Sequence, residues 1–194
     1  MHWRLSKCLV LFYICLSSSL VLSHEINIDG KLDDPAWKNA DEYTKYYESL
    51  PFTLNEPKDF QKVLILEDEK GIYIGFINKQ DKDTIRANKH ERDDEMANAD
   101  KAGLAIDFDG DGLAAYSFNV SAGGSIADGI YRNENEVNYD WDADWKSGVF
   151  IDEDYWYAEM FIPWSIAPMK AVSGEFREVK LSFWRLLAAE WRVN

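Results

Sequence analysis

The sequence predicts an all-β fold: a distorted β-sandwich of short antiparallel strands with one or two short helical turns. Short apolar segments recur along the chain at roughly 8–12 residue intervals, the spacing typical of strands in a sandwich. Clusters of Asp, Gly and Asn, which favour turns for backbone reasons, separate these segments. Within several segments apolar and polar side chains alternate, as a strand with one buried face requires.

Residues 1–23 have the features of a secretory signal peptide. Two cations, Arg4 and Lys7, precede an apolar run from Cys8 to Leu16, and small residues lead to a cleavage point after Ser23. The apolar run is shorter than the ~20 residues that a helix needs to span a bilayer. We therefore expect one domain, residues 24–194, that is secreted or periplasmic and has no membrane span after cleavage.

Composition narrows the function classes. The net charge of −14 becomes two units more negative when Arg4 and Lys7 leave with the signal. This argues against a nucleic-acid partner, because phosphates need a basic surface. Both cysteines lie in the signal, so no disulfide is expected in the domain. Eight Trp, ten Tyr and ten Phe are enough to fill a core and also to stack on a sugar ring.

The domain is predicted to begin with a strand at Ile26 and Ile28 that turns at Asp29. Asp34 followed by Pro35 is typical of a helix start, so residues 35–40 are expected to form one helical turn with Trp37 folded inward. Residues 43–48 are expected to be extended.

Three hairpins are predicted around acidic turns, and two further strands follow the same alternation. The turns are 68–71, 109–112 and 152–154; the flanking strands are 63–67 with 72–78, 104–108 with 114–120, and 149–151 with 156–163; the further strands are 126–131 and one near 179–183. Residues 80–100 are polar without a clean period and are expected to form a long loop with one helical turn, the kind of loop that often carries function. Glu159 is expected to point away from the core and to pair with Arg185 or Lys180.

Several segments together resemble the family 9 carbohydrate-binding modules over essentially the whole domain. The matching segments are 28–37 (IDGKLDDPAW), 71–76 (GIYIGF), 107–112 (DFDGDG), 115–120 (AYSFNV), 156–164 (WYAEMFIPW) and 183–185 (FWR). The resemblance implies a distorted β-sandwich with bound calcium and a pocket in which two tryptophans enclose a terminal sugar. Trp191 matches the position of the C-terminal tryptophan. The loop from Arg86 to Lys101, which would supply the other one, has no aromatic residue, and Met96 is its nearest large apolar side chain.

Segments 92–94 (RDD) and 139–145 (YDWDADW) most resemble the branch of this family found at the N-terminus of large bacterial exported proteins with a C-terminal, outer-membrane β-barrel region. The resemblance therefore implies that the chain is a fragment or a truncated gene product that lacks this C-terminal partner region.

Asp107, Asp109 and Asp111 match the opening of an EF-hand loop. Position twelve of such a loop falls on Phe118, which has no carboxylate, so the spacing excludes an EF-hand. Two interpretations stay open: an acidic hairpin without an ion, or a different calcium site that uses some of these carboxylates together with Asp128, which lies in a strand that also matches the family.

Trp141 and Trp145 alternate with aspartates, so in an extended segment the indoles face one way and the acids the other. The indoles either form a sugar platform or belong to the core. Arg92 and Glu95, in the long polar loop, are candidates for bonding sugar hydroxyls, unless the loop is only solvated. With Trp191 they complete the candidate sugar-binding residues.

The sequence thus predicts an exported, non-catalytic domain that binds a sugar or a glycan end and is linked to carbohydrate catabolism. The alternative is a periplasmic structural module of a larger outer-membrane protein that has lost sugar binding. A glycoside hydrolase needs two carboxyl groups held about 5–10 Å apart across a cleft, and the sequence marks no such pair among its 35 acids.

Overall fold

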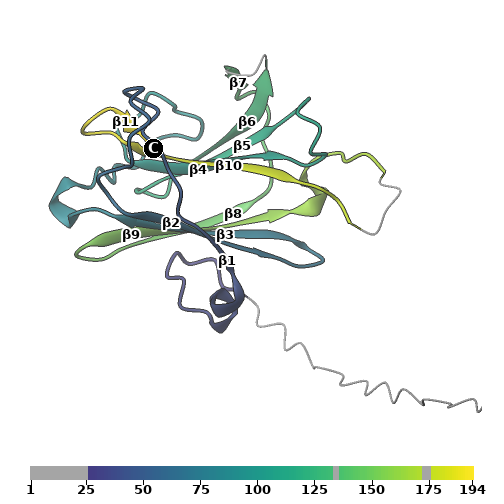
Figure 1. The fold of residues 1–194 in the computed structure, drawn as a ribbon, viewed down its shortest axis with the longest axis horizontal. Coiled ribbons are helices and arrows are strands. Elements are labelled where there is room, and N and C mark those ends of the chain that lie inside the picture. The colour runs from purple at the N-terminus through teal and green to yellow at the C-terminus, as the bar shows by residue number, and fades with distance from the viewer. Residues whose placement is uncertain (1–25, 133–135, 172–175) are drawn as a thin grey trace, which may run out of the picture.

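The computed structural model describes residues 26–132, 136–171 and 176–194, so the predicted signal peptide lies outside the described residues. Two antiparallel sheets pack face to face, as Figure 1 shows, and this confirms the predicted β-sandwich. No helix in the described part of the chain has the length and hydrophobicity needed to cross a membrane.

The lower sheet in Figure 1 has five strands in the order β1-β2-β3-β9-β8. Their bounds are β1 Asp41–Tyr43, β2 Gln61–Glu67, β3 Gly71–Lys79, β8 Lys146–Ile151 and β9 Tyr155–Pro163. The β2–β3 and β8–β9 pairs are the first and third predicted hairpins, with Val63 opposite Phe76 and Val149 opposite Ala158.

The upper sheet has six strands in the order β11-β10-β4-β5-β6-β7. Their bounds are β4 Lys101–Asp107, β5 Tyr116–Ser121, β6 Ile126–Arg132, β7 Glu136–Asn138, β10 Lys180–Leu187 and β11 Arg192–Val193. In this sheet Leu104 lies opposite both Phe118 and Phe183, which places the second predicted hairpin and the predicted late strand side by side.

The core lies between the two sheets. Ile74, Phe76 and Met160 from the lower sheet and Leu104 and Phe118 from the upper sheet are fully buried in one hydrophobic cluster. These side chains occupy alternate positions of their strands, so the period-two pattern of the sequence does mark the faces that meet.

Three short 3-10 turns occur in the described residues: η1 Pro35–Asn39, η2 Lys82–Thr84 and η3 Trp164–Ile166. The turn expected at residues 35–40 is confirmed, with Trp37 buried. The Asp34 carboxylate does not cap it; it instead accepts the backbone N–H of Asn27 at 2.9 Å. The strand expected at Ile26 and Ile28 does not form, and only Tyr43 of the segment expected to be extended lies in β1.

The N-terminal segment instead crosses the outer side of the lower sheet, where Figure 1 shows η1 beneath β1. One fully buried carboxylate, Glu159 on β9, holds it there. Glu159 accepts the backbone N–H groups of Asp29 and Gly30 at 2.8 and 2.7 Å and the indole N–H of Trp37 at 2.9 Å. The expected ion pair with Arg185 or Lys180 is therefore wrong.

Glycines make this close contact possible. A Cβ on Gly148 would lie 2.6 Å from the backbone of Asp29, and a Cβ on Gly75 would lie 2.4 Å from the Leu32 side chain. At Gly148 the backbone of the segment lies so close to the sheet that a side chain would not fit, whereas at Gly75 the Leu32 side chain occupies the space that a Cβ would take.

Candidate functional site

The acidic turn between β4 and β5 is satisfied by bonds within the protein. Asp107 accepts three backbone N–H groups of the turn at 2.7–3.2 Å. Asp109 pairs with Arg177 at 2.7 Å, and Asp111 pairs with Lys170, whose hydrogen bond lowers the pKa of the Asp111 carboxyl. In residues 26–132, 136–171 and 176–194 no three His, Cys, Asp or Glu side chains form a group that could hold a metal ion. As arranged, these carboxylates are already bonded to backbone and cationic groups of the protein, and a calcium site at this turn stays a prediction.

Asp128, the fourth candidate metal ligand, lies on the core face of β6, fully buried and apart from that turn. Its carboxylate pairs with Arg92 and accepts the backbone N–H of Ala143 at 2.7 Å. Burial raises the pKa of Asp128, and the bonds from Ala143 and Arg92 offset this only in part.

Arg92 also pairs with Asp142 at 2.9 Å. Two residues that the sequence assigned to different sites, Asp128 to a metal and Arg92 to a sugar, thus pair with one another. Their ion pair fastens the long loop of residues 80–100 to β6 and to the segment before β8.

Trp141 and Trp145 belong to the core. Trp145 is 7% exposed and packs edge-on against Phe118, with the ring centroids 5.5 Å apart. Trp141 is partly buried and tilts against Tyr116 at 5.0 Å. The predicted alternation is present, because Asp142 and Asp144 are exposed between the indoles. The indoles, however, face the core, so neither is placed to stack on a ligand.

The outer face of the upper sheet carries a different set of residues, which we call the outer sheet face. Since Leu104, Phe118 and Phe183 point into the core, the residues between them on each strand point outward. The outer sheet face comprises Gly103 and Ala105 of β4, Ser117 and Asn119 of β5, Ala127, Gly129 and Tyr131 of β6, and Ser182 and Trp184 of β10.

Trp184 provides a partly exposed aromatic surface on the outer sheet face. Its indole lies directly over Gly103, since a Cβ there would be 2.6 Å from the ring and 2.2 Å from Oδ1 of Asn119. Gly103 therefore leaves room for the indole to pack closely on the sheet. A partly exposed indole suits recognition of a pyranose, because its apolar surface can pack against the C–H face of the sugar.

A depression of about 720 Å³ opens on the same face. Ala105 and Ser182 lie in it, and Leu113 and Tyr131 are among the side chains around it, whereas Trp184 is not part of its lining. Ala105 and Ser182 are directly opposite each other on neighbouring strands, two residues along each strand from Gly103 and Trp184. The volume is within the usual range of small-ligand pockets, roughly 300–1,000 Å³.

Glu95 is a predicted sugar-binding residue that does lie near the outer sheet face. Its main-chain carbonyl accepts a hydrogen bond at 3.0 Å from Nζ of Lys101, a buried side chain of β4. Burial raises the pKa values of Tyr131 and Tyr139, and the Glu95 carboxylate raises both further. Glu95 therefore brings an acceptor for hydroxyl groups to the edge formed by these two tyrosines.

Trp191 lies in the loop between β10 and β11, at the end of the upper sheet. Its side chain is 62% exposed, and its backbone has a φ of 49°. A positive φ is uncommon for a bulky residue, and such strained positions concentrate at ligand sites. The loop is anchored by a hydrogen bond of 2.8 Å from the Ala188 N–H to the Asp100 carboxylate. Trp191 is thus largely exposed, and its role as a stacking surface stays a prediction.

The sequence analysis does not include Trp184 and Tyr131 among the candidate site residues. The signal for Trp184 is nevertheless present: Ser182 and Trp184 alternate with the apolar Leu181 and Phe183, so if those two face the core, Ser182 and Trp184 point outward. A tryptophan at an outward position of a strand marks a candidate contact surface.

Comparison with known proteins identifies the fold. No protein-family model and no curated protein matches the chain. Among solved structures, a proposed carbohydrate-binding protein from Bacteroides uniformis matches with a TM-score of 0.57 and 13% identity, over 77% of this chain and 72% of that one. A family 9 carbohydrate-binding module from Caldicellulosiruptor kristjanssonii, in complex with cellotriose, matches with a TM-score of 0.56 and 14% identity, over 84% of this chain and 72% of that one. The chain therefore has the fold of the family 9 modules, which confirms the fold that the sequence resemblance implied.

Proposed function

We propose that this chain is a non-catalytic carbohydrate-binding domain that recognises a sugar or a glycan end on the outer sheet face. The observation that carries the proposal is Trp184, a partly exposed indole packed over Gly103 on the face that also holds a depression of about 720 Å³. The two structural neighbours, described as carbohydrate-binding proteins, support it.

The chemistry of the outer sheet face suits a sugar. Trp184 offers an apolar surface to the C–H side of a pyranose ring, while Tyr131 and Ser182 offer hydroxyl groups that both donate and accept. Glu95 lies near the edge, where its carboxylate interacts with Tyr139. Ala105 lines the depression with a small side chain, which leaves room for a ring to approach the sheet there.

The positions of the perturbed acids support binding without catalysis. Among the described residues, the carboxyl groups whose pKa burial raises are Asp128 and Glu159. Asp128 points into the core toward Arg92, and Glu159 is enclosed under the N-terminal segment. A general acid must reach the glycosidic oxygen, and neither group faces the outer sheet face.

The proposal includes export and a role in carbohydrate catabolism. Its support is the signal-like composition of residues 1–23, with Arg4 and Lys7 ahead of an apolar run. A secreted or periplasmic binding domain would hold a glycan close to the enzymes that degrade it.

A second candidate is a structural module of a larger protein that has lost sugar binding. One observation favours it: Ser117 and Asn119, the polar side chains of β5 on the outer sheet face, are only 1% and 2% exposed. If they stay covered, the face offers a ligand fewer hydrogen-bonding groups.

Isothermal calorimetry and tryptophan fluorescence with cellotriose, xylotriose and glucose distinguish the two candidates. We expect saturable binding that Trp184→Ala abolishes and Trp191→Ala weakens. The matched control is Phe150→Ala, which removes a 39% exposed aromatic ring from β8 of the other sheet and leaves binding unchanged. Absence of binding to every sugar by the folded protein would favour the structural module, and binding that survives Trp184→Ala would place the sugar elsewhere.

A further inference from the structure

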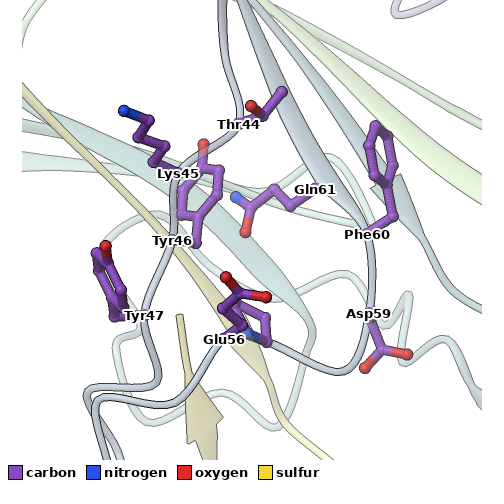
Figure 2. Close-up of a pocket in the computed structure, with 9 residues that line it drawn as sticks. Thr44, Lys45, Tyr46, Tyr47, Glu56, Asp59, Phe60 and Gln61 are labelled. Carbon is purple, nitrogen blue, oxygen red and sulfur yellow. The ribbon is translucent and has the colours of Figure 1, made fainter.

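A second pocket lies in the loop between β1 and β2. Its volume is about 250 Å³, several times the ~30 Å³ of one water molecule. Figure 2 shows its lining, with Tyr46, Tyr47 and Glu56 from the loop and Phe60 and Gln61 from the start of β2. None of these residues belongs to the outer sheet face.

The Gln61 side chain gives this pocket a polar wall. Gln61 is 3% exposed, and neither its amide nitrogen nor its amide oxygen has a hydrogen-bond partner among the described residues. In Figure 2 the amide is directed from β2 toward Tyr46. Tyr46 is 7% exposed, and its hydroxyl also lacks a partner within the described part of the chain.

Further unpaired polar groups lie behind Gln61, inside the sandwich. Asn78 lies opposite Gln61 on β3, and Trp156 lies opposite Asn78 on β9. Both are fully buried, and the Asn78 amide and the Trp156 indole nitrogen are unpaired within the described residues. Leaving a buried polar group unpaired is costly, so a wall of such groups indicates that molecules other than the protein pair with them.

The charged residues that line the pocket balance one another. Lys45 and Glu56 carry opposite charges, and the Asp59 carboxylate is already bound by Arg192 at 2.7 Å. The buried guanidinium of Arg185 does not line the pocket and donates to the Lys79 carbonyl and the Gln80 side chain at 3.0 and 2.7 Å. The lining therefore favours a neutral ligand. The polar groups, an amide and a phenol hydroxyl, each donate and accept, which matches neighbouring hydroxyl groups on a ligand.

Aromatic rings form the apolar part of the pocket lining. Tyr47 and Phe60 are 57% and 47% exposed at the pocket, where an apolar ring face can pack on them. The Tyr46 ring is held by an edge contact with Tyr43, with centroids 5.3 Å apart. The pocket is therefore lined like a small ligand site, with apolar walls and a few polar groups that fix orientation.

We propose that this pocket is a second binding site, independent of the outer sheet face, for a small neutral molecule with neighbouring hydroxyl groups, such as a single pyranose. Gln61 and Tyr46 bond its hydroxyls, and water molecules pair with Asn78 and Trp156 behind them.

The test follows the side-chain amide signal of Gln61 by ¹⁵N NMR during titration with D-glucose, D-galactose and D-xylose, with calorimetry on variants. We expect a saturable shift with at least one sugar, and about tenfold weaker binding in Gln61→Leu and in Tyr46→Phe. Both variants keep or gain thermal stability, because the atoms they remove have no partner among the described residues. Phe52→Ala, a 78% exposed residue of the same loop that does not line the pocket, is the control and binds as the wild type does.

The Trp184→Ala variant distinguishes binding in this pocket from binding on the outer sheet face. A Gln61 shift that persists in Trp184→Ala supports a second site even if the outer sheet face proves unable to bind sugar. A Gln61 signal that responds to none of the three sugars overturns the proposal and leaves a pocket that holds only water. The proposal is also overturned if the Gln61 response disappears in Trp184→Ala while Gln61→Leu binds sugar normally.

Discussion

Replacing Glu159 by alanine tests how the N-terminal segment is held to the sandwich. The carboxylate is fully buried and accepts three hydrogen bonds, from the N–H groups of Asp29, Gly30 and the Trp37 indole, at 2.7–2.9 Å. Each buried donor left without an acceptor costs about 1–3 kcal/mol. Asp29 is partly exposed and can turn to water, so we expect a total loss of about 3–5 kcal/mol.

Chemical and thermal denaturation measure this loss. For a domain of this size it corresponds to a fall in Tm of roughly 10 °C. Glu159→Gln keeps one acceptor oxygen and should lose less, about 1–3 kcal/mol. Limited proteolysis should at the same time cut the N-terminal segment faster in Glu159→Ala, because its anchor is gone.

The control is Glu42→Ala on β1. Glu42 pairs with Lys62 at 2.8 Å, but its side chain is 57% exposed, so its removal should change stability by less than about 1 kcal/mol. A loss below about 1 kcal/mol for Glu159→Ala, or an equal loss for both variants, would refute the reasoning that Glu159 anchors the segment.

Arg92→Ala leaves the buried Asp128 carboxylate without its cation. Because the Arg92 side chain is 36% exposed, we expect the free energy of unfolding to fall by only about 2–3 kcal/mol, measured by urea denaturation. An unchanged denaturation midpoint would contradict the pairing. Burial raises the pKa of the Glu159 carboxyl above 4.5, so in the folded protein this carboxyl binds a proton at a higher pH than in the unfolded chain. The contribution of Glu159 to stability therefore falls as the pH rises through the raised pKa. The stability difference between the wild type and Glu159→Gln should therefore narrow as the pH rises from about 4 to 7, and a widening difference in urea titrations would be inconsistent with a raised pKa. Asp109 and Asp111 are already paired with cations, so adding calcium or a chelator should shift the Tm by less than about 1 °C, whereas a clear rise with calcium would show that the turn rearranges to bind it.

The sequence by itself was sufficient to predict the β-sandwich, its three hairpins and the helical turn that buries Trp37. These features are local: strand faces follow from alternation, and turns follow from Asp and Gly between apolar segments. Alternation also separated exposed Asp142 from buried Trp145, although it did not show whether the indoles faced core or ligand.

Only the tertiary structure decided which distant residues meet. Arg92 pairs with Asp128, and Glu159 holds Gly30 from a position 129 residues away. Trp184 becomes a candidate site residue because β10 lies beside β4, where Gly103 leaves room for its ring. A local pattern tells which face of a strand is apolar, but partners across a sandwich are chosen by packing and burial among segments far apart in the chain, and no short window of sequence contains that information.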